Sequence, residues 1–343
     1  MRWQGQTIGA EADGALPGLA SLEGLVRTVR TPEFAGITFH EVLAKSGLNR
    51  VPAAAKLPFE WTVNPYRGCT HACVYCFARQ THTYLDLDAG GDFDRQIVVK
   101  TNVVEVLRRE LASPSWCRDP VALGTNTDPY QRAEGRYRLM PGIIRALADS
   151  GTPFSVLTKG PTARRDIPLL VAAAHDVSVG FGVSIAIGDE ALHRAIEPGT
   201  ASPRGRLELV REVTEAGLRC HVMLAPVLPY LTDTNEALDG LLARIAAAGA
   251  ASASVLALHL RPGARDWYFT MLERDYPKLV PAYRRLYAGG TYAASWYRDD
   301  LARRVAPLLE HHGLGRSEGP SSHRDVAEAA RPSPVPLEEP TLF

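Results

Sequence analysis

Asn64-Pro-Tyr-Arg-Gly-Cys-Thr-His-Ala-Cys-Val-Tyr-Cys-Phe-Ala-Arg79 is the stretch around which the chain is organised. It places three of the five cysteines in one loop with the spacing C-x3-C-x2-C, namely Cys69, Cys73 and Cys76. Three thiolates in so short a loop favour a metal centre. A tetrahedral zinc site would need a fourth ligand, for which His71 and His82 are the nearest candidates. An iron–sulfur cluster needs no fourth ligand if one iron stays open for a substrate.

Length and composition indicate a globular, enzyme-sized protein. The 343 residues, 45% of them hydrophobic, are enough for one large α/β barrel or two ordinary domains. Lys+Arg and Asp+Glu balance at 38 each. The net charge therefore provides no overall electrostatic attraction to nucleic acid or to an anionic membrane. No apolar run is long enough to span a bilayer, and residues 1–6 lack the apolar core of a signal peptide. We therefore expect a cytoplasmic protein with reduced thiols and no membrane partner.

Apolar strands alternate with amphipathic helices through the middle of the chain. Six strands are expected, at 60–64, 121–125, 153–158, 177–186, 220–225 and 254–258. Helices are expected at 77–84, 139–149, 166–174, 189–196, 206–216 and 235–248, and a further strand and helix at 97–112. This alternation predicts a parallel sheet covered by helices, as a barrel or partial barrel, with its chemistry at the carboxyl ends of the strands.

The flanking regions divide the chain further. Residues 1–58, with a helix expected near 41–46, form an N-terminal extension, and 59–262 form the core barrel. Residues 263–312 are expected to be a C-terminal helical region covering the barrel. The Ser-, Pro-, Glu- and Ala-rich residues 313–343 should be a disordered tail.

Polar residues or chain breaks follow the expected strands. The second strand ends in Gly124-Thr-Asn-Thr-Asp-Pro-Tyr-Gln131, the third in Thr158-Lys-Gly160, and the fourth at Ser184. Together the strand ends offer an acceptor, a cation, hydroxyl groups and an apolar surface, as a binding site for a polar small molecule needs.

The cysteine loop, with Tyr75 just before its last cysteine, resembles the cluster loop of the radical S-adenosylmethionine (SAM) superfamily. SAM carries an amino group, a carboxylate, a ribose diol and an adenine, and the strand ends offer the acceptor, cation, hydroxyl partners and apolar surface that it needs. The segments T-x-T-D-P-Y-Q, L-T-K and E-P resemble the spore photoproduct lyase-like branch, whose members are often labelled DNA repair photolyases, over roughly residues 60 to 300. The resemblance implies a partial (β/α)6 TIM-like barrel with N- and C-terminal extensions. It also implies a 4Fe–4S cluster that reduces SAM to a 5′-deoxyadenosyl radical, which abstracts hydrogen from a substrate. A reductant protein of the flavodoxin or ferredoxin type is the expected partner.

Carried over residue by residue, the resemblance makes Cys69, Cys73 and Cys76 the cluster ligands. It implies that Thr127 and Asp128 hold the amino group of SAM, that Lys159 pairs with its carboxylate, and that Ser184 lies beside them.

Three further positions follow from the same resemblance. Tyr75 would line the adenine. Glu197 and Arg206 match the E-P segment and the arginine after it, which places them near the mouth of the fourth strand.

One position departs from the spore photoproduct lyases. Those enzymes carry a cysteine after the second strand that returns a hydrogen atom to the product radical, and this chain has Gly124 at the corresponding place. Cys117 and Cys220 are the remaining cysteines, and buried structural roles are the simpler interpretation of both. We expect a related radical enzyme with a different substrate, with spore photoproduct lyase-type DNA repair as the alternative.

Aromatic residues and arginines gather near predicted strand mouths in three segments: Tyr130, Arg132, Arg136, Tyr137 and Arg138, then Trp267 and Tyr268, then Trp296, Tyr297 and Arg298. They would suit a nucleic-acid substrate, although amphipathic side chains covering the barrel give the same pattern. A non-catalytic zinc or iron–sulfur nucleic-acid-binding protein is a further alternative. The chain ends Glu339-Pro-Thr-Leu-Phe343, which is similar to the short peptides that dock on the bacterial sliding clamp.

Overall fold

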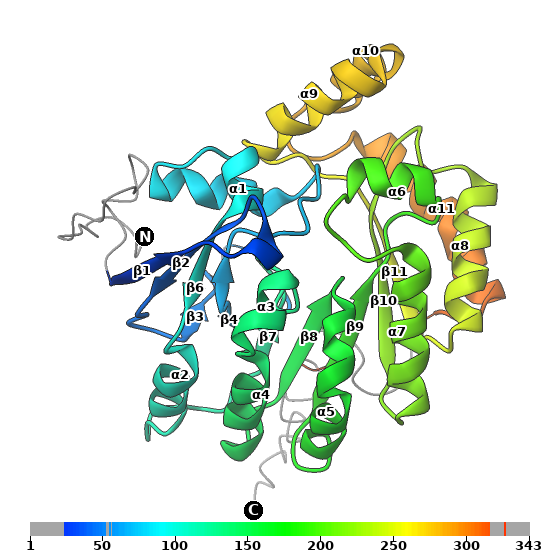
Figure 1. Cartoon of the computed structure of the whole chain (residues 1–343). Coiled ribbons are helices and arrows are strands. Elements are labelled where there is room, and N and C mark those ends of the chain that lie inside the picture. The colour runs from blue at the N-terminus through cyan, green and yellow to red at the C-terminus, as the bar shows by residue number, and fades with distance from the viewer. Residues whose placement is uncertain (1–23, 53–54, 56, 316–325, 327–343) are drawn as a thin grey trace, which may run out of the picture.

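A seven-stranded sheet forms the centre of the computed structural model, which describes residues 24–52, 55, 57–315 and 326 (Figure 1). Its order is β11-β10-β9-β8-β7-β4-β3. Six strands run parallel: β4 (Trp61–Val63), β7 (Val121–Leu123), β8 (Phe154–Thr158), β9 (Val179–Ser184), β10 (Cys220–Val227) and β11 (Ser252–Ala257). Within the described ranges β11 does not pair with β3 (Leu48–Arg50), so the barrel is partial, as the resemblance implies.

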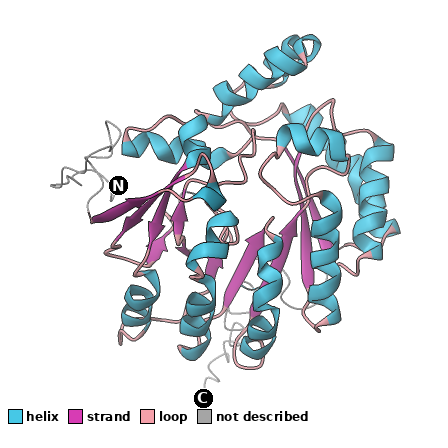
Figure 2. Cartoon of the chain, in the orientation of Figure 1, coloured by secondary structure: helices cyan, strands magenta, loops and turns pink. Residues whose placement is uncertain are grey.

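Helices cover the outside of this sheet, as Figure 2 shows. They include α4 (Met140–Asp149), α5 (Ile167–Ala173), α6 (Glu190–Ile196), α7 (Pro203–Glu215) and α8 (Asn235–Ala247). All six residues of β9 are buried, as expected for a strand covered on both faces. Side-chain N-caps define the starts of α7 and α8. The hydroxyls of Ser202 and Thr234 accept hydrogen bonds from the backbone N–H groups of Gly205 and Ala237.

Residues 38–42 form a strand and residues 43–47 form no helix, so the helix expected near residues 41–46 is wrong. A second sheet has the order β1-β2-β6-β5, with β1 (Leu25–Val29), β2 (Thr38–Val42), β6 (Gln96–Lys100) and β5 (Tyr66–Arg67). All five residues of β2 are buried and the strand pairs on both sides. This tertiary pairing outweighs the short local helix signal. The strand and helix expected at 97–112 are confirmed as β6 and α2 (Val103–Leu111).

Short helical elements lie between the longer strands and helices. They are the 3-10 helices Pro32–Phe34, η4 (Phe77–Leu85), η5 (Pro161–Asp166) and Pro277–Leu279, and the short helices α1 (Gly91–Arg95) and α3 (Arg132–Tyr137). The helix expected after the cysteine loop is therefore present as the 3-10 helix η4.

Three helices follow the barrel: α9 (Ala264–Asp275), α10 (Val280–Leu286) and α11 (Ser295–His311). In Figure 1, α9 and α10 stand above the carboxyl ends of the strands and α11 lies beside α8. The chain stays packed at the start of the expected tail, since Leu314 is buried and its carbonyl accepts from the N–H of Ala253. The clamp-like segment 339–343 lies outside the described residues. No helix in the described part is long and apolar enough to cross a membrane.

Candidate active site

The cysteine loop leaves β5 and passes directly over the carboxyl ends of the parallel strands. Successive turns shape it, with the N–H groups of Ala72 and Cys76 donating to the carbonyls of Cys69 and Cys73. A distant segment holds it from the other side, because the N–H of Val74 donates to the carbonyl of Ile196 and the N–H of Gly199 to that of His71. The loop is therefore fixed by backbone contacts on both sides.

A cavity of about 230 Å³ opens between this loop and the strand ends. All three loop cysteines are free thiols and line it. Strand-end residues complete the wall: Asn126, Asp128, Leu157, Thr158, Lys159, Ser184, Met223, Ala225, Pro226, Leu256, Ala257, Leu258 and His259. The rule that chemistry gathers at the carboxyl ends of parallel strands thus holds here.

The thiols of this loop suit a cluster that brings its own positive charge. Burial raises the pKa of Cys73 far above its ordinary value and that of Cys76 to about 11, because a lone thiolate is poorly solvated there. Coordinated iron would supply the missing cation, and three soft sulfur donors on one cavity match an iron–sulfur cluster. The residues present therefore fit the group.

The two histidines considered as zinc ligands lie in different places. His82 is buried away from the cavity, and its Nε2 lies 2.8 Å from the carbonyl oxygen of Gln96. His71 lines the cavity, but its Nδ1 lies 3.3 Å from Asp128 Oδ2. Among the described residues, no three His, Cys, Asp or Glu side chains converge closely enough to hold one metal ion.

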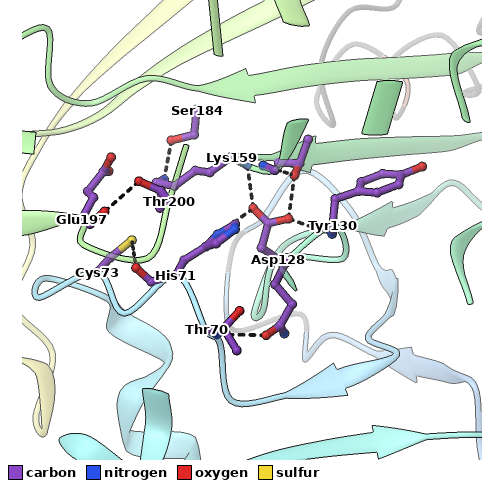
Figure 3. Close-up of polar contacts among 12 residues, drawn as sticks. Thr70, His71, Cys73, Asp128, Tyr130, Lys159, Ser184, Glu197 and Thr200 are labelled. Carbon is purple, nitrogen blue, oxygen red and sulfur yellow. Dashed lines mark hydrogen bonds and ion pairs between the residues drawn. The ribbon is translucent and has the colours of Figure 1, made fainter. Parts of the chain in front are cut away.

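Asp128 accepts several hydrogen bonds at the strand ends (Figure 3). Its Oδ1 accepts from Thr158 Oγ1 at 2.6 Å and from the Tyr130 N–H at 2.9 Å. Its Oδ2 accepts from the Lys159 N–H at 2.6 Å and faces His71. Burial alone would raise the pKa of Asp128, but His71 and these donors outweigh it, so the pKa is lowered. The carboxylate is thus ionised in the cavity wall.

Lys159 extends from the end of β8 toward β9 (Figure 3). Its Nζ donates to Ser184 Oγ at 2.6 Å and lies 5.9 Å from the centre of the Tyr75 ring. All three side chains line the cavity. The structure therefore brings together the lysine, serine and tyrosine that the sequence placed at one site.

Glu197 and Arg206 lie behind the cavity wall and act through the residues that form it. Both are fully buried, and Arg206 Nη2 lies 2.5 Å from Glu197 Oε2. The other oxygen of Glu197 accepts from the Tyr75 hydroxyl, and Arg206 Nη1 donates to the Ser184 carbonyl at 2.8 Å. Burial works to raise the pKa of Glu197, but Arg206 and Lys159 lower it to about 2. This pair orients Tyr75 and Ser184 and does not line the cavity.

Thr127 is turned away from the cavity. Its buried hydroxyl donates to the Tyr66 carbonyl at 2.9 Å, which fixes the loop after β7 to β5. The preceding Asn126 lines the cavity in its place.

Sequence reasoning also missed Phe77, Met223, Leu256 and His259 in the cavity wall. A signal was present for two of them, because Phe77 directly follows Cys76 and His259 follows the sixth strand.

No cysteine beyond the loop lines the cavity. Cys117 is exposed before β7, and Cys220 is fully buried as the first residue of β10. Both lie at the amino ends of the strands, opposite the cavity. Gly124 has φ +86°, and a Cβ there would lie 1.9 Å from the Leu157 carbonyl oxygen. No side chain fits at that position without a backbone shift.

Most of the interleaved aromatic residues have packing roles. Tyr130 is buried with its hydroxyl on Asp166, and Tyr137 packs on Phe39. Tyr268 and Tyr297 are buried in the C-terminal core, which confirms the covering interpretation for them. Trp296 remains exposed.

A different set of rings leads out of the cavity, and we call it the ring row: Phe77, His259 and Tyr292. Neighbouring ring centroids are 5.8 Å apart at both steps, with tilts of 35° and 33°. Arg261 lies 5.3 Å from the Phe77 centroid and Arg298 lies 6.0 Å from that of Tyr292. Phe77 and His259 line the cavity, whereas Tyr292 is 59% exposed. The row therefore joins the cavity to the surface.

Known proteins match both the sequence and the fold. The sequence model of the radical SAM superfamily matches residues 63–241, just over half of the chain. Uncharacterized proteins of Mycobacterium tuberculosis and Mycobacterium bovis are each 57% identical over 347 residues, covering all of both chains. An uncharacterized protein of Methanocaldococcus jannaschii is 25% identical over 197 residues, which are 57% of this chain and 70% of that protein.

Solved structures of spore photoproduct lyase share the fold. One complexed with dinucleoside spore photoproduct has a TM-score of 0.60 at 15% identity, covering 81% of this chain and 80% of the other. A single-site variant has a TM-score of 0.60 at 16% identity, covering 80% and 79%. The sequence match and this spore photoproduct lyase-like fold agree with the site, and the chain belongs to the radical SAM superfamily, whose members use a 4Fe–4S cluster and SAM.

Proposed function

We propose that this chain is a radical SAM enzyme that abstracts hydrogen from a substrate bound in the cavity at the strand ends. When bound, the cluster and SAM supply a 5′-deoxyadenosyl radical through one-electron reduction of SAM. The observation that carries the proposal is that three free thiols line the same cavity as Asp128, Lys159 and Ser184. The chain's own residues would bind SAM, orient it and keep water from the reacting atoms.

Asp128 is proposed to hold the amino group of SAM in place of His71. A carboxylate offers about four lone-pair positions, and Tyr130, Thr158, Lys159 and His71 occupy them all. The His71 contact, at 3.3 Å, is the longest of the four, and His71 itself lines the cavity. An ammonium group could replace it and leave the three other donors to fix the carboxylate.

Lys159 is proposed to pair with the carboxylate of SAM. An ammonium carries three donors, and one of them is used on Ser184. Among the described residues the other two donors have no hydrogen-bond partner, and Lys159 lines the cavity beside the Tyr75 ring, which would give an apolar wall for the adenine. Glu197 and Arg206 hold Tyr75 and Ser184 in these positions.

Lys159→Met should weaken SAM binding with little effect on cluster content. Loss of a charge-assisted hydrogen bond costs about 1.5–3 kcal/mol, so the Kd for SAM should rise roughly 10- to 150-fold. Anaerobic equilibrium dialysis of the reconstituted protein measures it. Lys278→Met, at an exposed lysine in the C-terminal region, is the matched control. Equal SAM affinity in the two variants would remove Lys159 from the SAM site.

A nucleic acid with an unpaired base is the substrate class that the ring row supports best. Stacked rings accept any base through its π face, and flanking arginines suit phosphates. The ring row and its two arginines provide both at the cavity mouth. A base stacked on Tyr292 would have its sugar within reach of the cavity, where hydrogen abstraction takes place.

Binding of a fluorescent single-stranded oligonucleotide at low salt tests this class. Tyr292→Ala should raise the Kd about 5- to 150-fold, since one stacked base contributes about 1–3 kcal/mol. Arg298→Gln should reduce the slope of log K against log salt by about 0.7. Tyr84→Ala is the matched control, because Tyr84 is 66% exposed and does not line the cavity. No binding at low salt, or equal losses for Tyr292 and Tyr84, would exclude this substrate class.

Spore photoproduct lyase-type repair is the alternative reaction, and Gly124 counts against it. That chemistry needs a thiol beside the cavity after the second strand, where a Cβ would meet the Leu157 carbonyl. Repair of spore-type lesions in the dark by the reconstituted protein would favour this alternative. A colourless protein holding one zinc, with no release of 5′-deoxyadenosine, would favour the non-catalytic alternative instead.

Gly124→Cys should therefore destabilise the protein rather than install a hydrogen donor. A positive φ costs a non-glycine residue about 1–3 kcal/mol, and the contact with Leu157 adds to it. Urea unfolding of the metal-free protein should show a loss of about 3 kcal/mol or more. Gly135→Cys is the control, because Gly135 lies in α3 and a Cβ at that position would have nothing within 4 Å. A Gly124→Cys variant as stable as the control would contradict the close approach of the Leu157 carbonyl to Gly124.

A further inference from the structure

Arg79 lies fully buried directly against the cysteine loop. Its Nε and Nη2 donate to the Cys73 carbonyl at 3.1 and 2.9 Å. Its Nη1 donates to the Gly90 carbonyl at 2.9 Å and to that of Ala89 at 3.3 Å. One side chain thus ties the middle cysteine of the loop to the segment before α1.

Two aromatic rings and one carboxylate complete its surroundings. The guanidinium carbon lies 5.2 Å from the Phe93 centroid and 5.1 Å from that of Trp267, a residue of α9. Nη2 also donates to the two oxygens of Asp94 at 2.9 and 3.1 Å. Asp94 is partly exposed, with 15% of its side chain accessible. The cation is therefore shielded from water by rings, while the counter-charge lies on the side nearer solvent.

A neutral side chain could donate the hydrogen bonds to Cys73. These bonds therefore do not explain why a positively charged residue is buried at this position. A guanidinium is a permanent cation, and burying one is costly unless it is compensated. One-electron reduction of a cluster on Cys69, Cys73 and Cys76 would add a negative charge at the loop that Arg79 contacts. A fixed cation in a poorly screened interior stabilises that charge strongly, and nearby charges and hydrogen bonds set the potentials of such clusters.

We propose that Arg79 is a positioning residue that fixes the cysteine loop and, through its buried charge, raises the reduction potential of the cluster, while Asp94 limits how much of that charge the cluster feels. This inference rests on the cluster alone and holds whatever the substrate is. It also gives α9 a role in the site, because Trp267 closes one face of the guanidinium.

Opposite shifts in two charge variants test the proposal. Clusters are reconstituted anaerobically in Arg79→Gln and Asp94→Asn, and their midpoint potentials are measured by redox titration followed by electron paramagnetic resonance. The titrations are run at pH 8, where Asp94 is ionised, because burial raises its pKa only to about 6 against the opposing effect of Arg79. At a fixed applied potential, Arg79→Gln should lower the ratio of reduced to oxidised cluster about tenfold. For a one-electron couple this corresponds to a midpoint potential lower by about 59 mV. Asp94→Asn should raise that ratio.

The controls separate charge from loop integrity. Arg118→Gln removes an exposed arginine at the amino ends of the strands and should leave the potential unchanged. Arg79→Lys keeps the positive charge but loses the planar guanidinium with its several N–H donors. The reduction potential of its cluster should therefore stay near that of the parent protein. Hydrogen exchange of the metal-free protein should be faster at the amides of residues 69–79 in both Arg79 variants, since the anchor on Cys73 is weakened.

Two outcomes overturn the proposal. The first is an unchanged or lowered potential in Asp94→Asn, a variant that retains Arg79 and needs no repacking. The second is equal shifts in Arg79→Gln and Arg79→Lys, which would assign the effect to loop geometry alone. A failure of substrate binding or turnover leaves these measurements intact, so it is distinguishable from a failure of this inference.

Discussion

Cys73→Ala is expected to abolish the release of 5′-deoxyadenosine from SAM. Cys73 is the middle one of the three proposed cluster ligands, is buried in the cavity wall and has its carbonyl anchored by Arg79. Changes outside a metal's own ligands cost about 10- to 100-fold, so loss of a ligand should exceed that range. Iron and sulfide content after anaerobic reconstitution, and 5′-deoxyadenosine released with SAM and reductant, are the measurements.

Cys117→Ala is the matched control for that experiment. Cys117 is a free cysteine at the opposite, amino ends of the strands, and it should be replaceable without loss of iron or activity. Full cluster content in Cys73→Ala, or an equal loss in the two variants, would contradict the assignment of the loop as the cluster site.

Glu197→Gln is expected to destabilise the metal-free protein by about 3–5 kcal/mol at pH 7, because it leaves Arg206 as an uncompensated buried charge. Both side chains are fully buried, and among the described side chains Arg206 Nε already lacks a hydrogen-bond partner. Urea unfolding measures the loss. Glu212→Gln is the control, since Glu212 pairs with Arg164 at the surface and such pairs contribute about 0–1 kcal/mol.

The same pair predicts a pH dependence with a definite sign. The folded pKa of Glu197, about 2, lies below its ordinary value of 4.5. Its contribution, about 3 kcal/mol, is therefore fully present above pH 4.5 and is lost as the pH falls toward 2. The stability difference between the parent and Glu197→Gln should shrink over that window. A constant difference from pH 7 to pH 3 would contradict the lowered pKa.

A double replacement separates the charge effect from the loss of packing. Glu197→Gln combined with Arg206→Met removes both charges, and buried pairs replaced by apolar residues of similar volume are often neutral. The double variant should recover much of the stability that Glu197→Gln loses. A further loss instead would show that hydrogen bonds to Tyr75 and Ser184, rather than charge, dominate this region.

The sequence by itself determined the barrel and the centre of the site. Strict alternation of apolar strands and amphipathic helices is a local pattern, and it predicts six parallel strands that the structure contains. Since the carboxyl ends of parallel strands meet at one edge, Asp128, Lys159 and Ser184 could be placed together with the three cysteines from the sequence alone. The helix expected near residues 41–46 is wrong because β2 is stabilised by partners distant in the chain.

Only the tertiary structure decided where individual side chains point and what they contact. It turned the Thr127 hydroxyl to Tyr66, placed Glu197 and Arg206 behind Tyr75, and enclosed Arg79 between rings from α1 and α9. It also brought the Leu157 carbonyl against Gly124. Most of these contacts join segments far apart in the sequence. Periodicity and spacing report only which face of an element is buried, whereas the contact itself depends on how two elements pack together.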